Sequence, residues 1–356
     1  MEGEKGLDGK RNRKSVTVST EKEAKKILND FEYNLQRNML VTSSSMNVAE
    51  FMDHWMDTYV KYNCEVTTAY GYRNIINNHI KPYLGKLDLQ KLQPMHIQQY
   101  YKHLLEEKKL SPNTVHKHHA NLRKALDYAL KQQLVHRNVA DAVTLPKKKQ
   151  FVGGYYTKER LNTLLSLVKG TELELPVFIS AYLGLRREEI VGLRWKYVDL
   201  EKRILHVEEV RTSAGDQVVV KAPKTAKSRR SLYIEEELYE VLLSTQARQQ
   251  ELKDIFASDY DSSDYVYAQS NGKPHRVNSV TEKFSDFLKK HQLPKIRLHD
   301  LRHTFASILY DAGVDLKAIS EALGHSDVGT TNSIYTHRFD KTHKSTVSAM
   351  SKALKN

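Results

Sequence analysis

An imidazole and a guanidinium stand close together near residue 300. The segment His299-Asp300-Leu301-Arg302-His303 predicts a helix, because Leu301 and Phe305 continue an apolar stripe at helical spacing. On that helix His299 and Arg302 are three residues apart, so they lie on adjacent surface positions. The pair can present both groups to one ligand. A phosphate suits it best, because the planar guanidinium donates to two oxygens at once.

The same segment permits a metal-binding interpretation. His299 and His303 are four residues apart with an acid after the first, close to the H-E-x-x-H motif of zinc peptidases. The acid is an aspartate rather than the longer glutamate that serves as general base, and Arg302 would place a fixed positive charge beside the metal ion. No downstream Glu or His stands out as a third ligand. The sequence therefore favours a site without a metal.

A further histidine and a tyrosine follow this segment. Asp315 is a good N-cap for a helix that Gly324 is placed to end in a left-handed conformation. His325 then emerges directly after a turn of fixed geometry. Tyr335 comes ten residues later, and because the chain has 20 tyrosines, only its neighbours in the sequence single it out.

Two charged segments precede these residues. In the first, Gly184 ends a helix, Arg186 lies in the turn, and Glu189 falls in the first turn of the next helix, where the helix dipole favours acids. Alone, this segment predicts the start of a surface helix. The second segment, residues 223–230, is a basic loop between expected strands and contains Lys224. Alone, it is a cationic loop.

The expected elements divide the 356 residues into three segments. Residues 1–41 predict one strand at 15–18 and one helix capped by Thr20, which is too little to bury a core. Residues 42–146 begin with a serine-rich linker and are helical almost throughout, with apolar residues at helical spacing. Residues 150–356 predict helices mixed with a small sheet.

The third segment contains three expected strands and several helices. The strands are 204–207 and 218–220, joined through a turn at 213–216, and a third at 231–234. The expected helices are a helix that Thr157 begins and those near 172–183, 235–255, 278–291, 299–311 and 315–323.

One helix of the second segment has a strongly basic face. Ser111 begins it, and the basic residues on it include Lys117, His118, Arg123 and Lys124. A solvated surface and a surface that contacts phosphates both explain such a face.

The composition narrows the class of partner. A formal net charge of +13 favours a polyanion, because each cation that neutralises a phosphate releases counterions. No apolar run is long enough to span a bilayer, and no apolar segment follows the charged N-terminal residues, so neither a membrane nor secretion is expected. The single cysteine, Cys64, excludes an internal disulfide framework, which fits a reducing cytoplasm. No G-x-x-x-x-G-K phosphate loop and no carboxylate cluster for magnesium is found, so no cofactor is expected.

Taken in order, these segments resemble the tyrosine recombinase family, the integrases of temperate phages and conjugative transposons. The chain has a G-L-R-x-x-E box, a strand-flanked K-T loop, then H-x-L-R-H, L-G-H and a tyrosine. The resemblance implies a mainly α fold with a small antiparallel β-sheet, in which a helical core-binding (SAM-like) domain and a mixed α/β catalytic domain form a C-clamp around DNA. Residues 42–146 correspond to the first domain and 150–356 to the second.

The resemblance also implies roles at phosphorus. Arg186 and Arg302 bind the scissile phosphate, and His325 donates to a nonbridging oxygen. Tyr335 is the nucleophile that forms a 3′-phosphotyrosine, and His299 lies beside the second arginine, where it can act as general base.

Other roles follow from the same boxes. Lys224 protonates the leaving 5′ oxygen, with Lys227 as the competing candidate, and Glu189 supports the first arginine. The candidates for DNA contact are Lys117, His118, Arg123, Lys124, Lys227 and Arg229.

The implied function is integration and excision of a mobile element. A homotetramer would exchange strands between two double-stranded attachment sites through a Holliday junction, assisted by an excisionase and a host DNA-bending protein. The alternatives are a dimer-resolving recombinase of the same family, a type IB topoisomerase and a non-catalytic DNA-binding regulator. Residues 1–41 resemble the tail of the arm-type DNA-binding domain. The family's domain has three strands before its helix, so one strand here predicts a domain without its beginning.

Overall fold

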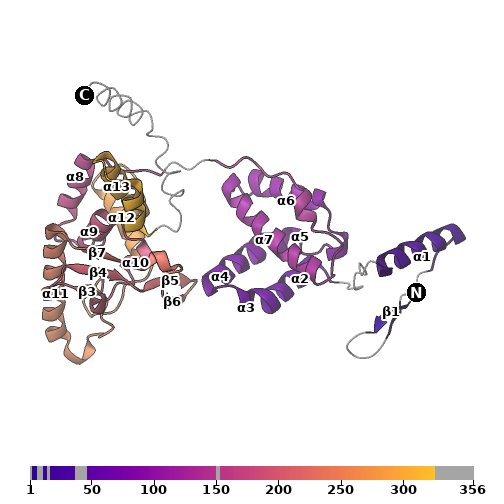
Figure 1. Cartoon of the computed structure of the whole chain (residues 1–356), viewed down its shortest axis with the longest axis horizontal. Coiled ribbons are helices and arrows are strands. Elements are labelled where there is room, and N and C mark those ends of the chain that lie inside the picture. The colour runs from indigo at the N-terminus through magenta and orange to yellow at the C-terminus, as the bar shows by residue number, and fades with distance from the viewer. Residues whose placement is uncertain (1, 6–10, 14–16, 37–45, 150–152, 325–356) are drawn as a thin grey trace, which may run out of the picture. The chain divides into compact units, whose positions relative to one another are not determined.

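The computed structural model describes residues 2–5, 11–13, 17–36, 46–149 and 153–324, shown with the rest of the chain in Figure 1. The chain divides into two compact units, residues 1–150 and 151–356, and each has its own hydrophobic core. His325 and Tyr335 lie outside the described residues. Every helix of the described part is too short or too polar to cross a bilayer.

The first residues form a hairpin and a helix. Strand β1 (Glu2–Lys5) pairs antiparallel with β2 (Arg11–Arg13), and helix α1 spans Glu21–Gln36. The Thr20 hydroxyl accepts a hydrogen bond from the Glu23 amide at 3.3 Å, so the expected N-cap is present. The expectation of a single strand was wrong. Residues 17 and 18 lie outside any strand, and the observed strands are so polar that no alternation of apolar residues indicates them.

Helices make up the body of the first unit. Asn47 and Glu50 form a capping box that begins the first of them, and the Ser111 hydroxyl accepts from the Thr114 amide at 3.2 Å to begin the last. The helices are α2 (Val48–Trp55), α3 (Lys61–Asn63), α4 (Val66–Ile75), α5 (Lys81–Leu84), α6 (Pro94–Glu106) and α7 (Pro112–Lys131), with π-helical segments at Met56–Val60 and Ile76–Ile80 and 3-10 turns at Leu89–Lys91 and Val139–Ala142. Their apolar stripes meet in one core around Phe51, Trp55 and Leu122.

The second unit combines helices with two small sheets. Its helices are α8 (Lys158–Val168), α9 (Glu174–Leu183), α10 (Arg187–Ile190), α11 (Glu236–Phe256), α12 (Ser279–Lys290), α13 (Leu298–Asp311) and α14 (Leu316–Leu323). Strands β3 (Val198–Asp199), β4 (Ile204–Val207) and β7 (Arg230–Tyr233) form an antiparallel sheet in the order β3-β4-β7. Strands β5 (Val210–Ala214) and β6 (Gln217–Lys221) form a hairpin. The predicted combination of many helices with small antiparallel sheets is confirmed.

The connection predicted between two of these strands was wrong. The turn at 213–216 does not join β4 to β6; it closes the hairpin of β5 and β6, while β4 pairs with β3 and β7. Strand β5 has the sequence Val-Arg-Thr-Ser-Ala, in which a buried arginine takes an inward position. A pattern that depends on apolar residues therefore misses it.

Helices α9 and α13 pack against each other in this unit, and α14 packs on α13. Both α9 and α14 end at a glycine in the left-handed conformation, Gly184 (φ 61°) and Gly324 (φ 65°), as the sequence predicted. A Cβ at Gly184 would lie 2.8 Å from side-chain carbons of Leu323 and of Phe305. The two helix ends therefore approach so closely that only glycine fits.

Candidate active site

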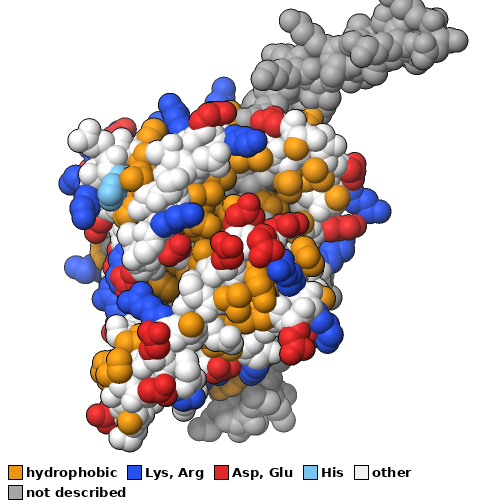
Figure 2. Space-filling view, turned by 90° about the vertical axis from the view of Figure 1, so that its left-hand side faces the viewer, with side chains coloured by type: hydrophobic (Ala, Val, Ile, Leu, Met, Phe, Trp, Pro, Cys, Tyr) orange, Lys and Arg blue, Asp and Glu red, His pale blue; other side chains and the backbone are white. Residues whose placement is uncertain are grey.

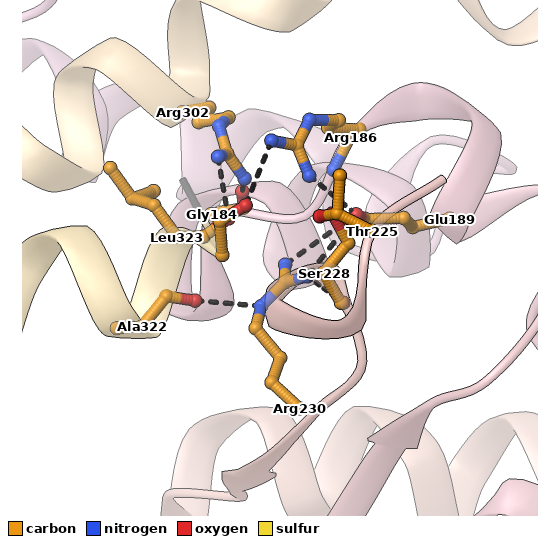
Figure 3. Close-up of polar contacts among 10 residues, drawn as sticks. Gly184, Arg186, Glu189, Thr225, Ser228, Arg230, Arg302, Ala322 and Leu323 are labelled. Atoms are coloured by element: carbon orange, nitrogen blue, oxygen red, sulfur yellow. Dashed lines mark hydrogen bonds and ion pairs between the residues drawn. The ribbon is translucent and has the colours of Figure 1, made fainter. Parts of the chain in front are cut away.

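Arg302 joins the C-terminal ends of two helices. Its side chain is buried, with 2 % of the residue exposed, and its two terminal nitrogens donate to the Gly184 carbonyl at 2.7 Å and the Leu323 carbonyl at 2.6 Å (Figure 3). Carbonyls at a helix C-terminus have no partner within the helix and carry the negative end of its dipole. These two carbonyls stabilise the buried guanidinium.

Arg186 approaches the same place from the turn after α9. As N-cap of α10, it donates its backbone amide to Glu189 Oε2 at 2.9 Å and its Nη1 to Oε1 at 2.8 Å. Its Nη2 donates to the Gly324 carbonyl at 3.3 Å. The G-L-R-x-x-E box is therefore a closed local motif, in which the glutamate three residues on fixes both ends of the arginine.

A third arginine completes the cluster. Arg230, the first residue of β7, donates Nη1 to Glu189 Oε1 at 3.1 Å and Nη2 to Oε2 at 2.9 Å, while its Nε donates to the Ala322 carbonyl at 2.7 Å (Figure 3). Burial alone would raise the pKa of Glu189. The hydrogen bonds and charge of Arg230, together with Arg186, outweigh it and hold that pKa below its usual value. Glu189 is therefore a buried carboxylate.

The three arginines bind three successive carbonyls at the end of α14. Arg230, Arg302 and Arg186 donate to residues 322, 323 and 324 in turn. These side chains come from segments that are far apart in the sequence, and the next residue along the chain is His325. Three guanidiniums and the Glu189 carboxylate leave the cluster with a net positive charge of two, which suits a phosphate.

His299 lies on the first turn of α13. Its ring is edge-on to that of His303, with the centroids 5.2 Å apart. Part of His299 reaches the surface, yet partial burial, followed by the charges of His303 and Arg302, lowers its pKa to about 4. The imidazole is therefore neutral at neutral pH and able to accept a proton.

The acid of the alternative zinc motif is used in another way. Asp300 is buried and accepts from the Arg297 amide at 2.7 Å and from Arg297 Nη2 at 2.6 Å. It caps the start of α13, and both of its carboxylate oxygens accept from Arg297. Within the described residues, no three His, Cys, Asp or Glu side chains gather so as to hold a metal ion.

The basic loop between β6 and β7 presents its lysines to solvent. Lys224 and Lys227 are both exposed. Thr225 and Ser228 hold the turn of this loop. The Ser228 amide donates to the Thr225 carbonyl at 2.9 Å, and the hydroxyls of the two residues are hydrogen-bonded at 2.8 Å. Arg229 is exposed and pairs with Glu208 at 3.5 Å.

Sequence reasoning missed Arg230 and chose its neighbour. Alternation along a strand places Arg229 and Arg230 on opposite sides, so one of the two would face the protein. With β7 expected to begin at 231, this signal did not extend to residue 230.

The basic face of α7 is only partly a surface. His118 is 2 % exposed, and its Nδ1 lies 2.7 Å from the Tyr100 hydroxyl. Burial, and then the nearby His79, lowers the pKa of His118 to about 4. The prediction that His118 lies on an exposed basic face is therefore wrong; it is a neutral core residue.

Two of the other basic candidates on α7 have protein partners. Arg123 is exposed and pairs with Asp141 at 2.6 Å, while Lys124 lies over the rings of Tyr59 and Tyr72 at 5.6 Å from each centroid. Lys117 is exposed.

Comparison with known proteins agrees with this fold. The phage integrase family model matches residues 155–342, and a phage integrase N-terminal SAM-like domain matches residues 47–105. The ICEBs1 integrase of Bacillus subtilis is 30 % identical over 95 % of this chain and 92 % of its own length. The integrase of Staphylococcus phage L54a is 24 % identical over 84 % of this chain and 92 % of its own length.

Among solved structures, the Tn1549 transposon integrase shares the fold with a TM-score of 0.71 and 21 % identity, covering 82 % of this chain and 95 % of that one. Lambda integrase gives a TM-score of 0.63 with 15 % identity, covering 91 % of this chain and 89 % of that one. Because the family model covers more than half of the chain, the chain belongs to the phage integrase family of tyrosine recombinases. It is a site-specific integrase of mobile elements, an enzyme that breaks and rejoins DNA.

Proposed function

We propose that this integrase exchanges DNA strands through a 3′-phosphotyrosine formed by Tyr335, on a phosphate bound by Arg186 and Arg302. The observation that carries the proposal is the convergence of these two arginines on adjacent carbonyls, residues 323 and 324, directly before His325. The G-L-R-x-x-E box lies more than a hundred residues before the H-x-L-R-H and L-G-H boxes, and the three meet at this point.

The cationic cluster supports the chemical step. The phosphodiester gains charge on its nonbridging oxygens in the transition state, and fixed donors aimed at those oxygens stabilise it. The Tyr335 oxygen attacks phosphorus, the bond to the 5′ oxygen breaks, and the phosphate remains esterified to the protein. Because the new ester conserves the bond energy, a 5′ hydroxyl reverses the step without ATP.

Two proton transfers accompany that step. Tyrosine has an ordinary pKa near 10, so it must lose its proton as it attacks. His299 takes this proton; its lowered pKa leaves the ring unprotonated at neutral pH, and also makes it a weak base that depends on the neighbouring cations to acidify the phenol. Lys224 gives a proton to the leaving 5′ oxygen, and Lys227 on the same loop is the competing donor. The exposed positions of both lysines allow either to reach a bound duplex.

The proposed substrate is a pair of double-stranded attachment sites. The Tn1549 integrase is bound to circular intermediate DNA in its structure, and a lambda integrase tetramer to a Holliday junction. We infer the same class of partner here, with residues 42–146 as the core-binding domain, 150–356 as the catalytic domain, the two closing as a C-clamp, and four protomers on the paired sites. Residues 1–41 would bind arm-type sites.

The charges on one face of the second unit argue against DNA binding there. On the side of the second unit where α8 and α11 lie, basic side chains are interspersed with acidic ones, and acids gather near its centre (Figure 2). A groove there between α8, α9 and α11 is lined by Glu174, Glu237 and Glu240. The acidic side chains there are unfavourable for binding DNA.

We also propose that an excisionase and a host DNA-bending protein act with the integrase, in the bacterial cytoplasm and at the nucleoid.

A nicked suicide substrate tests the chemistry. Its sequence comes from the junctions of the element that encodes the chain, with the nick placed so that the cleaved end diffuses away. Wild-type protein should form an adduct stable in SDS, and Tyr335→Phe should bind the duplex with unchanged Kd and form none. A non-catalytic regulator predicts instead that Tyr335→Phe keeps every activity. If wild-type protein gave no adduct on its own site, the proposal would fail.

A further inference from the structure

Arg230 is turned into the protein, unlike the other cations of its loop. Its side chain is 7 % exposed, whereas that of the neighbouring Arg229 is 55 % exposed. The pairing of β7 with β4 sets this side, since Arg230 is registered opposite Val207 in the sheet. Arg230 is therefore fixed by the sheet and does not belong to the exposed part of the loop.

Nearly all the donors of Arg230 are used inside the protein. A guanidinium has five N–H donors. Nε bonds the Ala322 carbonyl, Nη1 bonds the Ser228 carbonyl and Glu189 Oε1, and Nη2 bonds Glu189 Oε2. Such a side chain holds other groups in place and has little left for a substrate.

The charge balance shows what Arg230 holds. Glu189 accepts from Arg186 and from Arg230, each through a guanidinium. With both arginines present, one carboxylate is shared by two cations. Without Arg230, the buried carboxylate would be left with Arg186 alone, and that pair would be neutral. Arg186 would then offer far less net charge to a phosphate.

Arg230 also holds the backbone that precedes His325. Arg230 holds the carbonyl of Ala322, and Arg302 and Arg186 hold the next two. A Cβ at Gly324 would lie 3.1 Å from Arg230 Nη1, so the turn packs directly on this guanidinium. Loss of Arg230 frees one of the three points that fix the turn.

We propose that Arg230 is a positioning residue of the recombinase site, which shares Glu189 so that Arg186 keeps its charge for the phosphate, and which fixes the turn that leads to residue 325. The inference rests on the proposed function. It extends that function by a residue that touches neither DNA nor the reacting atoms.

The test measures single-turnover cleavage of the suicide substrate and the Kd for the same duplex, with full-length protein. Arg230→Ala should slow cleavage about 100-fold, the size of effect seen when one transition-state donor is lost, while Kd changes less than about threefold because phosphate contacts elsewhere supply most of the affinity. Arg203→Ala is the matched control. Arg203 also pairs with a glutamate, Glu236, in the same unit, and its loss should leave cleavage unchanged.

Two further variants separate charge sharing from a merely structural role. In Arg230→Ala, the added change Glu189→Gln removes the surplus carboxylate and should restore cleavage at least about tenfold, because Arg186 regains its charge. A structural role predicts that this double variant is worse than either single one. Arg230→Lys keeps a charge but only one point of contact, so its cleavage rate should lie between those of wild type and Arg230→Ala.

The outcomes are distinguishable. Absence of an adduct from wild-type protein would refute the proposed function. A normal wild-type adduct with unchanged cleavage by Arg230→Ala would refute only the role of Arg230. That role would also be refuted if Glu189→Gln failed to rescue Arg230→Ala, with thermal unfolding confirming that each variant is folded.

Discussion

Replacement of Arg302 by lysine tests whether its guanidinium, rather than its charge alone, holds the site together. The arginine bonds two carbonyls that belong to different helix ends, Gly184 at 2.7 Å and Leu323 at 2.6 Å, and the residue is buried. A lysine ammonium keeps the positive charge but is a compact group on a flexible stem, so we expect it to satisfy one carbonyl and leave the other without a partner.

The size of the effect follows from that geometry. A buried carbonyl left without a partner costs about 1–3 kcal/mol. Arg302→Lys should therefore lower the free energy of unfolding by about that amount, and Arg302→Ala by about twice as much, because both carbonyls lose their donor. The second loss approaches the total stability of a domain, about 5–15 kcal/mol, so lysine is the informative variant.

In free-energy terms, the loss in cleavage rate should exceed the loss in unfolding free energy. Removal of a preorganised donor to the transition state costs about 100- to 1000-fold in rate. We expect Arg302→Lys to lose this factor in single-turnover cleavage, measured on protein shown to be folded by urea denaturation. A lysine variant with an unchanged urea midpoint would refute the assignment of both carbonyls to the guanidinium. If that variant also cleaved at the wild-type rate, the phosphate-binding role would be refuted as well.

Two other residues give predictions about stability. A non-glycine residue with left-handed backbone costs about 1–2 kcal/mol of stability, and Gly184→Ala should cost more, because its Cβ would also meet Leu323. Gly170→Ala is the control, because Gly170 has φ 71° and nothing within 4 Å of an added Cβ, so it measures the backbone cost alone. Equal losses of unfolding free energy in the two variants would refute the close approach at Gly184. The pKa of His118 is about 4 when folded and 6.5 as its ordinary value, so the stabilisation from its neutral ring is complete above pH 6.5 and lost as the pH falls towards 4, at most about 3 kcal/mol. Urea unfolding followed by Trp55 fluorescence in a Trp195→Phe background should show this loss of unfolding free energy as the pH falls. His118→Gln should reduce that pH dependence, and an unaltered dependence in this variant would contradict the role of His118.

Local signals in the sequence were sufficient for most helices. Asn47, Ser111, Thr157 and Asp315 each begin the helix that follows, because a side-chain oxygen satisfies an amide that has no partner within the helix. Such signals act within three or four residues. For the same reason the left-handed glycine that ends α14 was predictable.

Features that depend on contacts between distant segments were not predictable in this way. The pairing of β4 with β7 rather than with β6 is set by the path of the chain across the sheet. The burial of His118 had a local signal that was overlooked. It lies three residues after Val115 and four before Leu122, within the apolar stripe of α7, and a basic side chain in that stripe must be neutral or paired.

The site itself was foreseen as a set of residue types but not as an arrangement. The order of the boxes indicates which side chains belong together, and the roles of Arg186, Arg302 and Glu189 stay predictions until cleavage is measured. No spacing in the sequence indicates that three arginines share one helix end. That fact depends on where the ends of α9, α14 and the start of β7 meet.

The partners of these arginines explain how a buried cluster remains useful for phosphate chemistry. If each arginine were paired with its own carboxylate, the cluster would be neutral and would repel a phosphodiester no less than it attracts it. Here four bonds of the three guanidiniums go to backbone carbonyls at helix ends, which carry only partial negative charge, and a single carboxylate serves two arginines. The carbonyls stabilise the buried guanidiniums without cancelling their charge. An arrangement of this kind requires helices that end at the site, which accounts for the glycines at 184 and 324 beside it.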